Sequence, residues 1–123
     1  MNDRRQLWLA DYLEHMLEAA RLAQQHIAGV EKEQFLGDRL RQQAVMMNLV
    51  IIGEAATKIR EGFPDFIQAN PSPALPWHQM IGMRNRMAHG YFDVDLEIVW
   101  DTVTKHLPVL ENFLATHAPQ GRR

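Results

Sequence analysis

The sequence predicts an all-α protein, an antiparallel bundle of four or five helices in one domain over residues 1–123. Apolar residues recur at intervals of three and four along most of the chain, and no stretch shows the period-two alternation of a half-buried strand. Glycine and proline clusters, such as the expected loop at residues 70–73, divide the chain into segments of helical length. The 123 residues are enough for one sizeable core. Residues 118–123 are expected to form a frayed tail.

The first expected helix spans residues 4–28 and ends at Gly29, a residue type that commonly follows a helix. Its apolar stripe, at helical spacing, comprises Leu9, Tyr12, Leu13, Met16, Ala20, Ala23 and Ile27. A connector is expected at residues 30–37. In it, the side chains of Phe35 and Leu36 are expected to pack against the bundle.

The second expected helix spans residues 38–61, with Asp38 as its N-cap. Its core stripe is Val45, Leu49, Ile52, Ala56 and Ile59. The opposite side is also apolar, through Met46, Met47, Val50 and Ile51. A helix that is apolar nearly all round is buried on two sides. The second side is then buried either by another subunit or, in the competing interpretation, by the rest of the same monomer.

Two further helices complete the expected bundle. The third spans residues 76–89 and ends at Gly90. The fourth spans residues 95–116, with Asp95 as its N-cap. Pro108 falls inside the fourth helix and should kink or split it, because proline lacks the N–H and its ring crowds the preceding turn.

Composition excludes several kinds of site. The chain has no cysteine, so it has neither disulfides nor thiolate metal sites, and a reducing compartment fits. None of the six histidines stands three or four residues from another, so neither a metal site nor a bound cofactor is expected. The formal net charge of −2 argues against a dedicated duplex-DNA binder, which would be basic, but leaves catalysis at a single phosphate open.

Nothing in the sequence predicts export or a membrane span. No long apolar run follows the polar start, so a secretory signal is not expected. The longest apolar block, residues 44–53, is too short to cross a bilayer and is typical of a buried helix. A cytoplasmic location is therefore expected.

The end of the third helix concentrates the residues that favour chemistry: Arg84, Asn85, Arg86, His89 and Tyr91. Arginine holds a phosphate with a rigid fork of donors. Histidine titrates near neutral pH and moves protons. These groups suffice for metal-independent RNA cleavage, in which a base deprotonates a 2'-hydroxyl, that oxygen attacks the adjacent phosphorus, and arginine offsets the charge of the transition state.

Helical geometry constrains this site. Residues five apart on a helix differ in direction by roughly 140°, so Arg84 and His89 do not share a face, whereas Asn85 and His89 do. Either His89 lies in the last turn beside Gly90, or the site combines residues of two chains. The competing structural interpretation is a helix end with solvated arginines, Arg86 among them, and a histidine that caps the last carbonyls.

Several motifs together resemble the HepT-like toxins of the HEPN superfamily. The most specific is Arg84-x4-His89-x-Tyr91, which matches that family's Arg-x4-His-x-Tyr signature. The likeness runs from the first expected helix to the fourth and includes Gly53-Glu54-Ala55 with Lys58, Pro76-Trp77, Ile81-Gly82-Met83-Arg84-Asn85, Val94-Asp95 and Trp100.

This resemblance implies an all-helical HEPN-like homodimer in which two Arg/His motifs face each other across a cleft. Arg84 and His89 would be the catalytic pair of an endoribonuclease acting on RNA, with Asn85 helping to orient them and Arg86 as a further phosphate contact. The resemblance also implies a type VII toxin–antitoxin pair. Its antitoxin, a MntA-like nucleotidyltransferase, would transfer AMP to Tyr91, and the bulk and charge of that group beside the arginine would then compete with RNA.

A function from another class remains open at this point: a non-catalytic helical partner or substrate-binding module of a nucleotidyltransferase. The acidic net charge fits this alternative slightly better, and the intact Arg84, His89 and Tyr91 fit the ribonuclease.

Outside that set, Glu54 and Lys58 are expected to form a surface ion pair or to line the cleft. Gly53 and Gly82 are expected to allow helices to approach closely.

Overall fold

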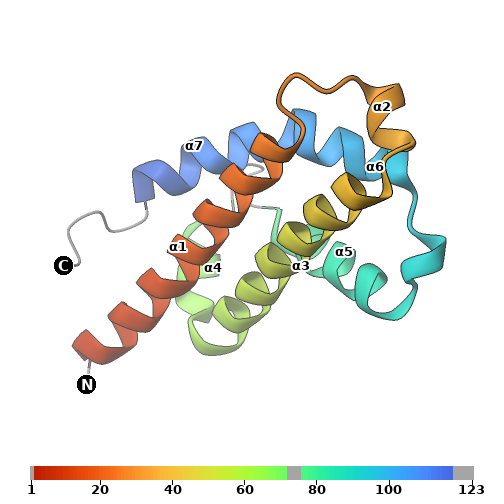
Figure 1. Ribbon diagram of the computed structural model, residues 1–123. Coiled ribbons are helices and arrows are strands. Elements are labelled where there is room, and N and C mark those ends of the chain that lie inside the picture. The colour runs from red at the N-terminus through yellow and green to blue at the C-terminus, as the bar shows by residue number, and fades with distance from the viewer. Residues whose placement is uncertain (1, 72–75, 118–123) are drawn as a thin grey trace.

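Every regular element that the structure describes is helical (Figure 1). This computed structural model describes residues 2–71 and 76–117, and within these ranges the predicted all-α class is confirmed. The predicted tail at 118–123 and the end of the loop at 70–73 lie outside the described residues. None of the described helices is both long enough and apolar enough to cross a membrane.

The four long helical segments lie within two residues of their predicted bounds. They are α1 (Asn2–His26), α3 (Arg39–Gly62), α5 (Trp77–His89) and a continuous run made of α6 (Leu96–Asp101), the π-helical η2 (Thr102–His106) and α7 (Leu107–His117). Three short elements join them: α2 (Lys32–Leu36), α4 (Pro64–Ala69) and the 3-10 turn η1 (Tyr91–Asp93).

The helix α2 forms where only a connector was expected. A capping box closes the start of α2. The side chain of Glu31 accepts from the backbone N–H of Gln34, and the side chain of Gln34 accepts from the backbone N–H of Glu31. Its Phe35 is fully buried and packs on Trp100, with ring centroids 5.4 Å apart. The predicted packing of Phe35 is therefore confirmed, and the short helix is what directs this side chain inward.

The predicted helix ends are confirmed by their hydrogen bonds. The Oδ1 atom of Asp38 accepts from the backbone N–H of Arg41 at 3.1 Å, and Oδ1 of Asp95 accepts from that of Glu97 at 2.9 Å. Each carboxylate thus satisfies one of the free donors at a helix start. At the end of α1, Gly29 adopts a φ of +75°, which is a left-handed conformation that glycine accepts without strain.

The core lies between α1 and α3, which run side by side in opposite directions (Figure 1). The helix α7 packs on α1, and α5 packs on α3. The predicted core stripe of α3 is buried in full: Val45, Leu49, Ile52, Ala56 and Ile59. Because α5 contacts the bundle mainly through α3, the position of the candidate active site depends on this one helix pair.

The predicted disturbance at Pro108 takes the form of a π-helical turn just before it. In this turn the N–H of Leu107 bonds to the carbonyl of Thr102, five residues back. The helix remains continuous through the proline, so it is not split. A wider turn accommodates the proline ring and the missing donor without ending the helix.

One face of α3 is left open by the rest of the chain. Successive residues of this face stand three or four apart and are all exposed; we call them the outer α3 face: Leu40, Gln43, Met47, Ile51 and Glu54. Leu40 is 79% exposed and Met47 60%. Within the monomer α3 packs on both α1 and α5, and Met46 is buried. Met47 and Ile51 stay exposed, so the described chain covers only part of the additional apolar surface.

Candidate active site

A close contact between α3 and α5 fixes the stem of Arg84. A Cβ atom added to Gly53 would lie 2.2 Å from Cβ of Arg84 and 2.8 Å from the carbonyl oxygen of Met80. Real Cβ atoms do not approach other atoms so closely, so only glycine permits this approach. The predicted role of Gly53 is confirmed. For Gly82 it is wrong, because an added Cβ would meet nothing within 4 Å.

The guanidinium of Arg84 is held from two directions. Its Nη1 donates to Oδ1 of Asn85 at 2.7 Å, and its Nη2 donates to Oε2 of Glu54 at 3.0 Å. The Arg84 side chain is 26% exposed and that of Glu54 48%. The guanidinium is thus partly sheltered, at the surface, and oriented before any ligand arrives.

The partner of Glu54 differs from the predicted one. Among the described residues, its carboxylate pairs with Arg84 and not with Lys58. Sequence spacing could not show this, because Glu54 and Arg84 lie 30 residues apart on different helices. The sequence did contain one signal for this pair, namely Gly53. A helix that packs closely against α3 at this glycine also lies next to the carboxylate of Glu54.

The side chain of His89 lies exposed at the last residue of α5. The helix ends where predicted, and the N–H of Gly90 bonds to the carbonyl of Arg86 at 2.7 Å. Asn85, one turn earlier, is also exposed. No hydrogen bond joins His89 to Arg84 in the described chain, which agrees with their different directions on the helix. Within the described part of one copy, the two side chains are therefore not directly bonded.

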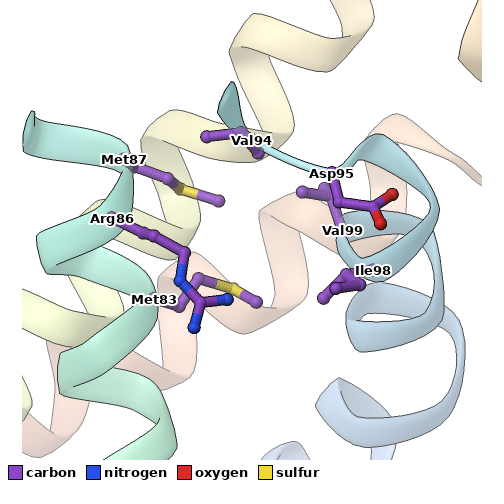
Figure 2. Close-up of a pocket in the computed structure, with 7 residues that line it drawn as sticks. All are labelled: Met83, Arg86, Met87, Val94, Asp95, Ile98 and Val99. Atoms are coloured by element: carbon purple, nitrogen blue, oxygen red, sulfur yellow. The ribbon is translucent and has the colours of Figure 1, made fainter. Parts of the chain in front are cut away.

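Arg86 belongs to a different surface of α5. It is two residues from Arg84 and so points roughly 160° away from it around the helix. Figure 2 shows it at a pocket between α5 and the start of α6 with the two residues before it, lined by Met83, Arg86, Met87, Val94, Asp95, Ile98 and Val99. The structure does not bring Arg86 to the Arg84 guanidinium.

Tyr91 follows α5 in the turn η1 and contacts the far end of the outer α3 face. Its hydroxyl accepts a hydrogen bond from Nε2 of Gln43 at 3.3 Å. Gln43 precedes Glu54 by eleven residues on α3, a separation of about 16 Å along a helix. Tyr91 and Arg84 therefore contact the same face of α3 three turns apart, so the hydroxyl does not lie beside the arginine.

A fully exposed aromatic ring stands next to this tyrosine. Phe92 is 96% exposed and lies edge-on to Tyr91, with ring centroids 5.6 Å apart.

No group of three or more histidine, aspartate or glutamate side chains that could bind a metal ion occurs in residues 2–71 and 76–117 that the structure describes.

Comparison with known proteins adds an independent line of evidence. A family model described as "Ribonuclease HepT-like" matches residues 16–116, a stretch that includes Glu54 and all of Arg84 to Tyr91. The chain is 38% identical over 101 residues to a Thermococcus cleftensis protein named "Probable ribonuclease HepT", covering 82% of this chain and 87% of that protein.

Two further relatives carry provisional names as RNases. One, from Caldanaerobacter subterraneus subsp. tengcongensis, is 33% identical over 100 residues, which is 81% of this chain and 85% of that protein. The other, from Methanocaldococcus jannaschii, is 40% identical over 76 residues, which is 62% of this chain and 59% of that protein. No solved structure matches the chain.

Proposed function

Since this chain belongs to the HepT-like ribonuclease family, we propose that it is a toxin endoribonuclease whose catalytic pair is Arg84 and His89. The observation that carries the proposal is the Arg84 guanidinium, which is fixed at the surface by Gly53, Glu54 and Asn85. A preorganised guanidinium offers fixed donors to the oxygens of a phosphate, where negative charge develops during phosphoryl transfer.

The proposed reaction needs no metal ion or cofactor, only protein side chains, the RNA and water. A ring nitrogen of His89 takes the proton of a ribose 2'-hydroxyl, and that oxygen attacks the adjacent phosphorus. The bond from phosphorus to the 5'-oxygen breaks, the leaving oxygen takes up a proton from water, and His89 releases its proton to water. The N–H groups of Arg84 stabilise the charge on the non-bridging oxygens. The products are a 2',3'-cyclic phosphate and a 5'-hydroxyl.

The test of this proposal is cleavage of RNA by the purified protein in EDTA. Fragments that end in 2',3'-cyclic phosphate support attack by the 2'-hydroxyl without a metal ion. A parent protein that cleaves no RNA contradicts the ribonuclease and favours a non-catalytic module that serves a nucleotidyltransferase.

We further propose that a second copy of the chain covers the outer α3 face. An exposed apolar row on one helix is typical of a protein interface, and a two-fold axis lets the same row serve both copies. Met47 and Ile51 lead along this face directly to Glu54 and its partner Arg84. A copy seated here would bring its own residues to the edge of the site, which His89 of the same chain does not complete.

Replacing Met47 by glutamate should convert the dimer into a monomer, because the new carboxylate would be buried without a partner in the interface. Light scattering at micromolar concentration measures the mass. Val109→Glu is the matched control, since Val109 is half exposed on α7, away from this face. A monomeric parent, or a dimer that persists in Met47→Glu, would contradict the proposed interface.

We propose that Tyr91 accepts AMP from a MntA-like nucleotidyltransferase as the antitoxin of a type VII pair. Tyr91 is 41% exposed, and the hydrogen bond described for its hydroxyl is the 3.3 Å bond from Gln43. This exposure supports access by a nucleotidyltransferase. Because Gln43 and Glu54, the α3 residues that bond Tyr91 and Arg84, are three helical turns apart, AMP on Tyr91 would act by extending along the outer α3 face or across the dimer.

Incubation with ATP and a MntA-like nucleotidyltransferase should raise the intact mass by one or more AMP units. Tyr91→Phe should show no gain, because the acceptor oxygen is gone. The second tyrosine of the chain supplies the control: Tyr12→Phe, on α1, should gain mass like the parent. Full modification of Tyr91→Phe would rule out this acceptor.

A further inference from the structure

We infer that Glu54 is a positioning residue that holds the Arg84 guanidinium in the orientation needed for a phosphate. The inference rests on the proposed ribonuclease function. Its structural basis is the bond between Nη2 of Arg84 and Oε2 of Glu54, 3.0 Å long, which joins the end of the arginine on α5 to the neighbouring helix α3.

Among the described residues three contacts restrict Arg84, and one of them, from Glu54, ties its charged end to the neighbouring helix. Gly53 packs on Cβ and Cγ and so fixes the start of the side chain. Asn85 bonds Nη1 but follows Arg84 on the same helix, so it moves with it. Glu54 bonds Nη2 from α3, across the helix contact. Without Glu54 the last bonds of the arginine would rotate about a fixed stem.

The bond leaves the arginine able to bind a ligand. A guanidinium has five N–H donors in a fixed fork, and the described residues use two of them. An exposed ion pair is usually weak because two long side chains must be ordered to form it. Here the packing at Gly53 already orders the stem of Arg84, so less freedom remains to be lost when the pair forms.

Two substitutions of Glu54 distinguish a positioning role from an effect of its negative charge. Glu54→Gln keeps an oxygen that accepts from Nη2 and removes the negative charge, whereas Glu54→Ala removes the acceptor. We expect kcat for RNA cleavage to fall about tenfold or more in Glu54→Ala, with KM within about threefold, because a misaligned group costs rate before it costs binding. Glu54→Gln should keep kcat within about threefold of the parent.

A matched control lies two turns further along the same face. Glu61 is an exposed residue of α3 with no ion pair among the described residues, so Glu61→Ala should cleave like the parent. Equal kcat in the parent and Glu54→Ala would overturn the inference and leave the ribonuclease intact. Glu54→Gln as slow as Glu54→Ala would also overturn it, because the carboxylate charge would then be what matters.

A second measurement does not depend on RNA. The guanidinium ¹⁵N–H signals of Arg84, identified by their loss in Arg84→Lys, should be resolved and slow to exchange in the parent and in Glu54→Gln. In Glu54→Ala they should collapse to the single averaged signal of a free arginine. If the parent cleaves no RNA, the proposed function fails while these spectra still decide whether Glu54 holds Arg84. Averaged signals in the parent would overturn the inference alone.

Discussion

Replacing Arg84 or His89 by alanine should abolish metal-free RNA cleavage, lowering kcat/KM by a factor of about a hundred or more for each residue. Arg84→Ala removes the donors that offset charge on the phosphate in the transition state. His89→Ala removes the base that takes the 2'-hydroxyl proton. Initial rates on one RNA in EDTA, measured for the parent and both variants, provide the test.

Each substitution has a control that removes an exposed residue of the same type elsewhere on α5 or α3. His78→Ala removes an exposed histidine from the first turn of α5, and Arg60→Ala removes an exposed arginine from α3. Both should cleave like the parent. Thermal unfolding should show that Arg84→Ala and His89→Ala remain folded, because neither side chain belongs to the buried core. Cleavage at the parent's rate in either catalytic variant would refute that residue's role.

Gly53→Ala should lower the free energy of unfolding by about 2 kcal/mol or more, since overpacking a close contact typically costs 1–3 kcal/mol. The added methyl group would lie 2.2 Å from Cβ of Arg84 and 2.8 Å from the Met80 carbonyl. The backbone carbonyl cannot move aside as a flexible side chain would, so α3 and α5 must separate. Urea unfolding followed by circular dichroism measures the loss.

Gly82→Ala makes the same substitution at a second glycine, and it should change the free energy of unfolding in the opposite direction. Its Cβ would meet nothing within 4 Å, so the variant should gain about 0.5–1 kcal/mol from the better helix propensity of alanine. The parent, Gly53→Ala and Gly82→Ala should therefore rank in a fixed order of stability. Gly53→Ala should also slow RNA cleavage, because separating the helices displaces Arg84 from Glu54. A stability of Gly53→Ala equal to that of Gly82→Ala would show that the close contact is not needed.

Helix positions were predictable from the sequence because their signals are local. Asp38 and Asp95 each bond a backbone donor two or three residues later, and Gly29 adopts a left-handed conformation next to the helix it ends. The two short helices α2 and α4 escaped prediction because five or six residues give no periodicity.

The residues of the candidate site could be proposed from the sequence, but their contacts could not. The motif from Arg84 to Tyr91 stands on one short segment, so spacing was enough to single it out and to exclude a shared face for Arg84 and His89. The bond to Glu54 and the difference between Gly53 and Gly82 depend on which side of α5 meets α3. That is decided by packing between distant segments, which no local pattern contains.

The contact at Gly53 also bears on how such a protein is controlled. The arginine stem is ordered by the packing of two helices, so it stays in place for as long as the bundle is folded, whether or not RNA is present. Packing of this kind keeps the start of the arginine side chain in one place in the folded bundle. Restraint on it must come from outside the bundle, by occupying the surface beside the guanidinium or by keeping two copies apart.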